Sequence, residues 1–147
     1  MKRDFAQRGS VAIELAILTP AVILFFVAMV IAGRITLAQQ AAEAAAFDAA
    51  RTASLARNAS AAQNEATAAA LASFRAQGIE CITLSVVVNT EGFAIEPPAP
   101  ATVTVSVSCH AQFADVALPL IEADLTKIVL SGQFTSPLDR YRSRSTS

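Results

Sequence analysis

A long uncharged run of hydrophobic residues follows the first few residues of the chain. No charged side chain occurs from Leu15 to Gly33. In a helix these roughly 19 residues span about 28 Å, close to the thickness of a bilayer's hydrocarbon core. The apolar region of a cleavable secretory signal is shorter, about 7–15 residues. The run therefore predicts a transmembrane helix, with a kink at Pro20 because proline cannot donate a backbone hydrogen bond.

Alanine makes up about half of the next stretch, from Ala38 to Ala76. Alanine has the highest helix propensity, and neither glycine nor proline interrupts the stretch before Gly78. We therefore expect the helix to continue to a stop at Gly78. A break at Asn58-Ala59-Ser60 is the alternative, because asparagine and serine side chains compete for backbone hydrogen bonds. Asp48 and Arg51 are three residues apart and can pair weakly.

Large apolar side chains are rare in this second helical stretch. They are Leu37, Phe47, Leu55, Leu71 and Phe74. A helix with so few large side chains buries little surface alone, but its small residues permit close approach to another helix. Two interpretations follow: the small face packs against neighbouring subunits, or it lies against the chain's own domain as a spacer. For the end from Leu71 to Phe74 we expect packing on the domain.

After Gly78 the hydrophobic pattern changes to a period of two, which is typical of half-buried strands. The first run is Ile82, Leu84, Val86 and Val88, with Val87 as an extra apolar residue, and the second is Val103, Val105 and Val107. A third strand is predicted over Thr126–Phe134, with Ile128 and Leu130 on one face.

The segments around these strands are predicted as loops. Glu91–Pro100 contains a glycine and three prolines, with room for a short edge strand at Phe93–Ile95. Asp115–Ala123 contains Pro119 and is predicted as a loop or a short turn of helix. The arginine- and serine-rich tail from Pro137 to Ser147 is expected to be frayed.

Composition limits the function more than it specifies it. With 147 residues the chain has room for one membrane helix and one small domain, and its net charge of −1 gives no general attraction to nucleic acid. Lys2, Arg3 and Arg8 precede the apolar run with only Asp4 against them. The positive-inside rule therefore places the N-terminus in the cytoplasm and the rest of the chain outside, although Arg34 weakens this asymmetry slightly.

One carboxylate, that of Glu14, stands at the edge of the apolar run. A charged side chain at mid-bilayer costs roughly 2.5–3.5 kcal/mol on insertion scales, and less near the interface. An acid at this depth is therefore a candidate functional residue. The alternative interpretation is that Glu14 lies at the interface and extends its carboxylate to water.

The basic leader ending in glycine, the glutamate and the apolar run together resemble a known family. The segment RGSVAIELAILTPAVILFFVAMVIAGR is similar to the start of TadE-like pseudopilins, minor subunits of Tad (type IVc) pili that carry a class III leader. The resemblance implies that a prepilin peptidase cuts between Gly9 and Ser10, which makes Glu14 the fifth mature residue. Leu15 departs from the bulky, often aromatic residue that follows this glutamate. The resemblance extends more loosely to the cysteine-bearing strands and the terminal FTSPLDRYR.

The resemblance also implies a non-enzymatic structural role and a pilin-like fold. This α+β fold has a long N-terminal helix whose outer part packs on a small antiparallel sheet. The expected organisation is a cleaved cytoplasmic leader (1–9), a transmembrane helix (10–36), an alanine-rich extracytoplasmic helix (37–77), a β domain (78–136) and a flexible tail (137–147). The implied partners are the membrane, a prepilin peptidase, the major pilin, other minor pilins and the inner-membrane assembly platform.

A role for Glu14 follows from the implied cleavage. The new N-terminus at Ser10 would carry an α-amino group that is mostly protonated at neutral pH. In stacked subunits the ammonium of one copy could meet Glu14 of a neighbour. Away from water such a pair is favourable only when both partners are present, so it would fix the register of assembly.

The chain contains two cysteines, Cys81 and Cys109. Outside the cytoplasm, two cysteines in a small domain usually form a disulfide. A simple hairpin with these residues directly opposite each other places Leu84 opposite Ser106, which mixes the apolar and polar faces. We therefore expect Cys81 to lie just before the regular ladder, or a β-bulge nearby.

No catalytic, metal or cofactor site is predicted. His110, the single histidine, adjoins Cys109 and has no second ligand pair at a familiar spacing. The two cannot form a nucleophile pair because adjacent strand residues point to opposite faces, and we expect His110 on the surface. Asn58-Ala59-Ser60 matches a glycosylation sequon by chance, within a predicted helix. Glu122 and Asp124 are expected to be solvated.

Two other hypotheses require neither Gly9 nor Glu14. In the first, the chain is an uncleaved single-pass anchor that presents a binding module outside the cell. In the second, signal peptidase releases a secreted domain after a small-residue motif that ends at Ala32 or Ala38.

Overall fold

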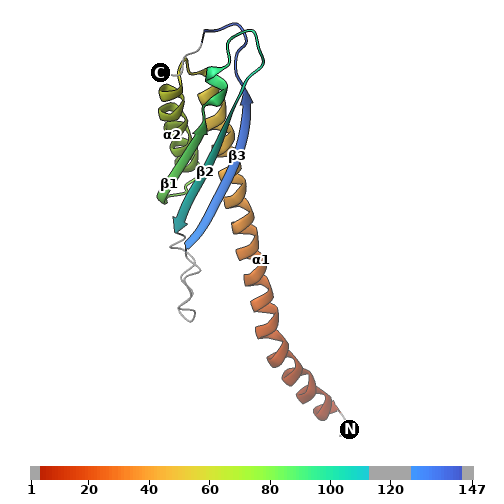
Figure 1. Cartoon of the computed structure of the whole chain (residues 1–147). Coiled ribbons are helices and arrows are strands. Elements are labelled where there is room, and N and C mark those ends of the chain that lie inside the picture. The colour runs from red at the N-terminus through yellow and green to blue at the C-terminus, as the bar shows by residue number, and fades with distance from the viewer. Residues whose placement is uncertain (1–3, 113–126, 144–147) are drawn as a thin grey trace. The chain divides into compact units, whose positions relative to one another are not determined.

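The computed structural model describes residues 4–112 and 127–143 and has an α+β fold (Figure 1). The elements are α1 (Asp4–Leu55), α2 (Ala59–Ala76), β1 (Cys81–Asn89), the 3-10 helix η1 (Glu91–Ala94), β2 (Thr102–Gln112) and β3 (Lys127–Pro137). Their contacts divide the chain into two compact units, one ending at Leu37 and one beginning at Ala38. A long N-terminal helix and a small antiparallel sheet confirm the predicted fold class.

The first unit contains the apolar part of α1, which continues through Pro20. Its large hydrophobic side chains are exposed: Leu15, Ile17, Leu18, Val22, Ile23, Leu24, Phe25, Phe26, Met29, Val30, Ile35 and Leu37. The hydroxyl of Thr19 donates to the carbonyl oxygen of Leu15 at 2.6 Å, so this polar group is satisfied within the helix. Among the described residues, α1 is the one helix long and apolar enough to cross a membrane.

The second unit begins with the outer part of α1, and the alanine-rich stretch breaks at the asparagine. α1 ends at Leu55, and α2 starts at Ala59 rather than continuing the same helix. The side-chain oxygen of Asn58 accepts a hydrogen bond from the backbone N–H of Ala61 at 2.7 Å, so it caps the new helix. The expectation of one continuous helix over 37–77 was wrong, and the alternative, a break at Asn58-Ala59-Ser60, is the one observed.

Gly78 ends the second helix, as predicted. Its φ of 70° lies in the left-handed region, where a Cβ would be strained. The backbone N–H groups of Gly78 and Ile79 donate to the carbonyl oxygens of Arg75 and Phe74, each at 3.0 Å. This pair of hydrogen bonds is a Schellman motif, which satisfies the last carbonyl groups of the helix.

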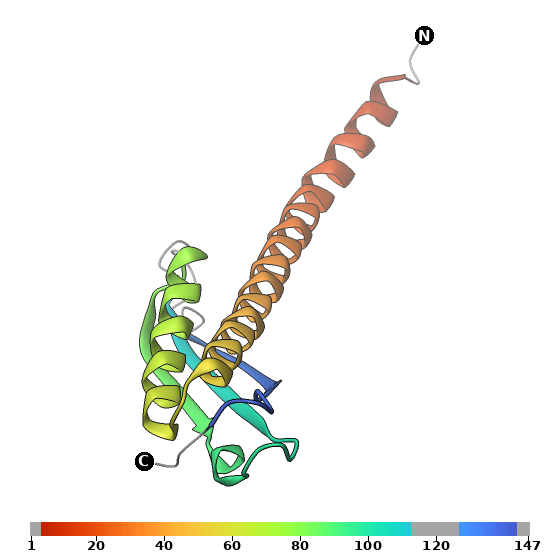
Figure 2. The ribbon, with the colours of Figure 1, turned by 90° about the horizontal axis from the view of Figure 1, so that it is seen from above.

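The three strands form one antiparallel sheet in the order β1-β2-β3, and the outer part of α1 and α2 lie side by side on one face of it (Figure 2). Val103, Val105 and Val107 of β2 point to this covered face and are buried. Ile128 and Leu130 share the same face, as the alternation predicted, because they pair with Ala111 and Cys109. The sheet therefore presents its other face to solvent.

Alanine forms most of the core between the helices and the sheet. The buried alanines of the two helices are Ala38, Ala41, Ala42, Ala45, Ala46, Ala49, Ala50, Ala53, Ala62, Ala66 and Ala70. Their spacing of three and four residues places them on one face of each helix. Phe74 is also fully buried, which confirms packing of the Leu71–Phe74 end on the domain. Of the two interpretations of the small face, burial against the chain's own sheet is the one observed.

The small side chains bring the backbone of α1 against β3. A Cβ at Gly132 would collide with the carbonyl oxygen of Ala42 and approach the backbone nitrogen of Glu43 to 2.9 Å. Only glycine can occupy this strand position without moving the helix. The sequence pattern did not identify Gly132, because the close approach depends on a helix about 90 residues earlier in the chain.

Two predictions around the strands were wrong. Ile82 was expected on the same face as Leu84, but it is 59% exposed. The ladder shifts between Cys81 and Thr83, and this bulge turns Ile82 outward. The proposed edge strand at Phe93–Ile95 is instead part of η1 and the residue after it.

The C-terminal segment and one ion pair also differ from expectation. Pro137 ends β3, and Leu138 is buried, with its backbone N–H donating to the carbonyl oxygen of Ala101 at 2.9 Å. The tail is therefore anchored at its start. Among the described residues Asp48 does not pair with Arg51; its carboxylate accepts the hydroxyl of Ser73 at 2.8 Å. The interpretations of residues 115–123, Thr126 and 144–147 lie outside the described residues, as do those of the side chains before Glu14.

Candidate functional site

The predicted processing site lies on α1. Gly9 and Ser10 are in helical conformation, within the first unit. Glu14 is one turn further along the helix, and its side chain is exposed at the start of the candidate span. Four residues correspond to about 6 Å along a helix. Among the residues whose side chains the structure describes, none covers the Glu14 carboxylate.

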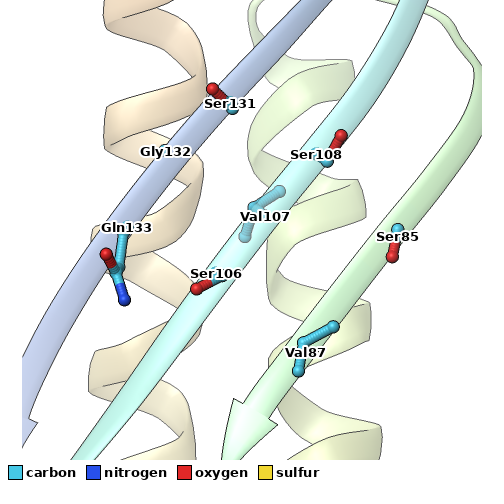
Figure 3. A pocket seen from close by; sticks show the side chains of 8 residues that line it. All are labelled: Ser85, Val87, Ser106, Val107, Ser108, Ser131, Gly132 and Gln133. Carbon is cyan, nitrogen blue, oxygen red and sulfur yellow. The ribbon is translucent and has the colours of Figure 1, made fainter.

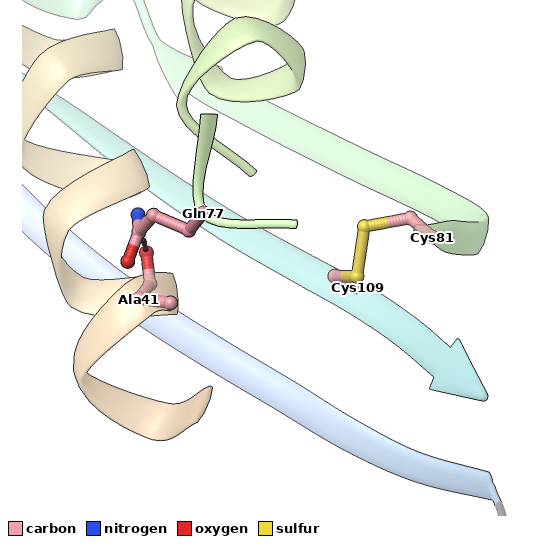
Figure 4. Close-up of a disulfide and its surroundings, with 4 residues drawn as sticks. All are labelled: Ala41, Gln77, Cys81 and Cys109. Atoms are coloured by element: carbon pink, nitrogen blue, oxygen red, sulfur yellow. Dashed lines mark hydrogen bonds between the residues drawn. A yellow bond between two sulfur atoms is a disulfide. The ribbon is translucent and has the colours of Figure 1, made fainter. Parts of the chain in front are cut away.

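The disulfide lies in the second unit and joins the two cysteines as expected (Figure 4). Their Cα atoms are 5.4 Å apart, and Cys109 is fully buried beneath the helices. Cys81 pairs with Ala111 while Leu84 pairs with Cys109, because the bulge lies between them. The bulge brings the sulfur atoms together and keeps the apolar faces aligned, which resolves the conflict seen in the sequence.

A glutamine side chain covers the free edge of β1. The amide nitrogen of Gln63, on α2, donates to the carbonyl oxygen of Val86 at 2.8 Å. Its amide oxygen accepts the backbone N–H of Val88 at 3.2 Å. The side-chain amide therefore makes the two hydrogen bonds that the N–H and C=O of one residue in a parallel fourth strand would make at this position. An edge strand with such groups unpaired is a template for another strand.

A second glutamine makes one hydrogen bond to the backbone of the opposite edge strand. Gln39 of α1 donates its amide to the carbonyl oxygen of Ser131 in β3 at 2.6 Å. Gln77, just after α2, donates to the carbonyl oxygen of Ala41 and so ties the two helices together (Figure 4). These roles could not be predicted from the sequence, because an isolated glutamine at a polar helix position is usually solvated.

The uncovered face of the sheet is rich in hydroxyl groups. A shallow hollow of about 370 Å³ lies across the three strands (Figure 3). It is lined by Ser85, Val87, Ser106, Val107, Ser108, Ser131, Gly132 and Gln133. None of these side chains titrates near neutral pH, so the hollow offers neither a general acid nor a general base.

The described residues contain no cluster of His, Cys, Asp or Glu side chains that could hold a metal ion. His110 is exposed and Cys109 is buried, so the adjacent residues do point to opposite faces. Among the described residues the fold brings together a disulfide, two glutamine amides bonded to edge strands and a close helix–strand contact.

Comparison with known proteins identifies only the N-terminal part of the chain. No curated protein and no solved structure matches it. Residues 9–51 match the family model of TadE-like protein, a range that begins at Gly9 and includes Glu14 and the candidate span. The match confirms the resemblance inferred from the leader, the glutamate and the apolar run, and over these residues the chain is similar to TadE-like proteins.

Proposed function

We propose that this protein is a minor pilin of a Tad (type IVc) pilus, a structural subunit without enzymatic activity. The single observation that carries the proposal is the family match, because it covers the glycine, the glutamate and the apolar helix together. TadE-like proteins are structural components of the Tad pilus.

In this proposal a prepilin peptidase removes residues 1–9 and leaves Ser10 as the N-terminus. The N-terminal segment lies in the cytoplasm before cleavage, and the domain beginning at Ala38 lies outside the inner membrane. The exposed hydrophobic side chains of α1 support membrane insertion, since an uncovered apolar surface of this length is unfavourable in water. The disulfide supports an oxidising compartment for the domain.

Glu14 then acts in assembly. The ammonium of Ser10 on one subunit would meet the carboxylate of Glu14 on a neighbour displaced by four residues along the helix, about 6 Å. The partner could be another copy, the major pilin or another minor pilin. Removing the charge leaves the ammonium without a counter-ion away from water, which is costly.

The experiment is to determine the N-terminal residue of the mature protein from membrane fractions, by intact mass and N-terminal peptide analysis. We expect Ser10. A start at Met1 or Lys2 would instead indicate the uncleaved anchored binding module. A start at Gly33 or Gln39 would indicate a secreted domain and contradict the pilus assignment.

The role of Glu14 needs a separate variant. Glu14→Gln keeps the size of the side chain and removes its charge, so cleavage at Gly9–Ser10 should continue while incorporation into pilus-assembly complexes falls. Normal assembly of the cleaved E14Q protein would contradict the register role and leave the rest of the proposal standing.

A further inference from the structure

The break between α1 and α2 meets the segment after β3 at one end of the second unit. Leu138, which follows β3, and Arg57, in the break, line one small hollow there. At the opposite end Gln39 of α1 bonds to Ser131 of β3. α1 and β3 therefore run in the same direction, and about 26 Å of helix, over 38–55, separates the two ends. The hollow thus lies at the end of the unit farther from its first residue.

This hollow contains charged residues from two segments that are distant in sequence. Arg57 comes from the helix break, whereas Asp139 and Arg142 follow β3, and the two arginines are 85 positions apart. The rest of the lining is Ser54, Ala56, Leu138 and Ser143. The volume of the hollow is about 10 Å³, so it has room for one water-sized group, such as a carboxylate oxygen. It cannot enclose a nucleotide or a cofactor.

Local hydrogen bonds fix the backbone beside both arginines. The side chain of Asn58 caps α2, which fixes the chain directly after Arg57. The backbone N–H of Tyr141 donates to Oδ1 of Asp139 at 2.9 Å. This bond closes a turn of the kind that aspartate side chains form with the backbone two residues on, and so fixes the chain before Arg142. The two arginines are therefore held at the hollow from both sides.

Positive charge is in excess at this end of the unit. Arg57, Arg140 and Arg142 are exposed, and none of them forms an ion pair or a hydrogen bond with another described residue. Among the described residues that line the hollow, Asp139 carries the one carboxylate, and it already accepts the N–H of Tyr141. Three arginines against one carboxylate leave a formal charge of +2. Guanidinium groups held close together repel each other, and an anion between them removes that repulsion.

An exposed aromatic ring adjoins these charges. Tyr141, between Arg140 and Arg142 in the sequence, is 93% exposed. Its ring offers a rigid apolar surface with a hydroxyl at one end. A sugar ring has an apolar C–H face that can lie on such a surface, and a uronic acid adds one carboxylate to each ring. We call Arg57, Arg140, Tyr141 and Arg142 the Arg57 site.

We propose that the Arg57 site binds an acidic polysaccharide. A carboxylate of one sugar lies at Arg57 and Arg142 with one oxygen in the hollow, and a neighbouring sugar ring lies on Tyr141. Guanidinium groups match carboxylates in geometry as well as in charge. The proposal rests on the proposed function in one respect, that the second unit lies outside the cytoplasm, where such polymers occur.

The number of charges favours a polysaccharide over nucleic acid. Double-stranded DNA carries one negative charge for about every 1.7 Å of helix axis, so proteins bind it through broad basic surfaces. The Arg57 site has three arginines, and the whole chain has a net charge of −1. A polymer with one carboxylate on each sugar has more widely spaced charges, which suits this small site.

Binding of the full-length protein, in a non-ionic detergent, to immobilised alginate tests the proposal. Alginate is a chain of uronic acids, and neutral dextran is the control polymer. We expect binding to alginate that weakens as salt screens the charges, and no binding to dextran. Arg57→Gln and Arg142→Gln should each weaken binding about three- to tenfold, because each removes one exposed charge contact. Arg75→Gln, the same substitution in the last turn of α2, is the matched control and should have no effect.

Variants of the tyrosine separate the ring from the charges. Tyr141→Ala removes the aromatic surface and should weaken binding to alginate, whereas Tyr141→Phe keeps the ring and should bind nearly as well as the unsubstituted protein. Thermal unfolding of each variant checks that the fold is unchanged. Equal binding by Y141A and Y141F would remove the ring from the proposal.

Several results would overturn the acidic polysaccharide as ligand. One is an unsubstituted protein that does not bind alginate, or that binds dextran equally well. Another is a weakening by R57Q and R142Q no greater than that by R75Q, since binding would then lie elsewhere on the chain. Tighter binding to single-stranded DNA than to alginate at the same salt concentration would indicate a nucleic acid instead.

The mature N-terminus of the same preparations separates this proposal from the proposed function. Ser10 as N-terminus without binding to alginate discards the Arg57 site and leaves the pilin assignment. A Met1 start with binding that depends on Arg57 and Arg142 discards the assignment and leaves an anchored binding module.

Discussion

The two parts of α1 treat hydrophobic side chains in opposite ways. In the first unit large residues such as Leu24 and Phe25 are exposed. In the second unit the residues that the helix buries are alanines, such as Ala45 and Ala49, while the larger Phe47 and Leu55 remain partly or mostly exposed. One helix, α1, therefore exposes its large side chains in the first unit and buries its small side chains against the sheet in the second.

This difference shows that the size of an apolar side chain does not by itself decide its burial. Large side chains provide the free energy of transfer into a bilayer, so a candidate span needs them on every side. Alanine provides little transfer free energy but allows the backbone of a helix to approach a strand closely, as at Gly132. The large side chains of the first unit suit the apolar environment of a bilayer. The small side chains of the second unit are buried against the sheet of the same chain.

The largest expected effect is a lower free energy of unfolding of the second unit, with no change in the first. Replacing both cysteines, C81A/C109A, removes a cross-link between residues separated by 28 positions. On the chain-entropy model this lowers the free energy of unfolding by about 3–4 kcal/mol. Urea titration of the full-length protein in detergent, followed by near-UV circular dichroism, measures the loss, with membrane association as the control. An unchanged unfolding midpoint would contradict a stabilising role for the disulfide.

A charge in the middle of the candidate span would instead weaken the membrane insertion of the first unit. Leu24→Arg places a guanidinium near mid-bilayer, at a cost of roughly 2.5–3.5 kcal/mol on insertion scales. We expect the fraction of protein that resists alkaline extraction from membranes to fall. Leu55→Arg is the matched control, because Leu55 is also exposed but belongs to the second unit. Equal extraction of the two variants would argue against Leu15–Gly33 as the span.

Two adjacent alanines, one buried and one exposed, test the close packing of α1 against the sheet in the second unit. Ala45 is fully buried, whereas Ala44 is exposed. Ala45→Leu overpacks the interface between α1 and the sheet and should lower the free energy of unfolding by about 1–3 kcal/mol. Ala44→Leu, with the same change in volume and in helix propensity, should have little effect. Thermal unfolding of both variants is the measurement, and equal melting temperatures would refute the close-packed alanine core.

The smallest expected effect concerns the edge of the sheet. Gln63→Leu keeps a similar volume but leaves the carbonyl of Val86 and the N–H of Val88 without their side-chain partner. We expect a loss of about 1–2 kcal/mol in the free energy of unfolding and a new tendency to oligomerise through β1. Size-exclusion chromatography with light scattering detects the oligomers. Gln40→Leu, at an exposed position of α1, should remain unchanged in both assays.

Local patterns predicted the three main strands and the disulfide. The alternation in Val103, Val105 and Val107 predicted which face of β2 is buried, because side-chain direction in a strand depends only on position. The mismatch of faces in a simple hairpin also predicted the bulge beside Cys81. The same bulge explains why the prediction for Ile82 was wrong. The bulge falls between Cys81 and Thr83, so Ile82 does not follow the alternation of the strand.

The contacts between elements could not be predicted in the same way. Asn58 was identified as a break because capping is local, but the pairing of Ser73 with Asp48 requires two helices to meet. The contact between the rings of Phe47 and Phe134 likewise could not be predicted, because the two residues are 87 positions apart in the sequence.

The sequence alone determined the candidate span, the position of Glu14 and the alternation of the strands, because each depends on neighbouring residues and on the fixed geometry of helices and strands. The tertiary structure alone decided that the alanines form the core, that Gly132 must lack a side chain, and that Gln63 and Gln39 close the sheet. These features depend on distances between segments far apart in the chain, and such distances are fixed only when the helices pack on the sheet.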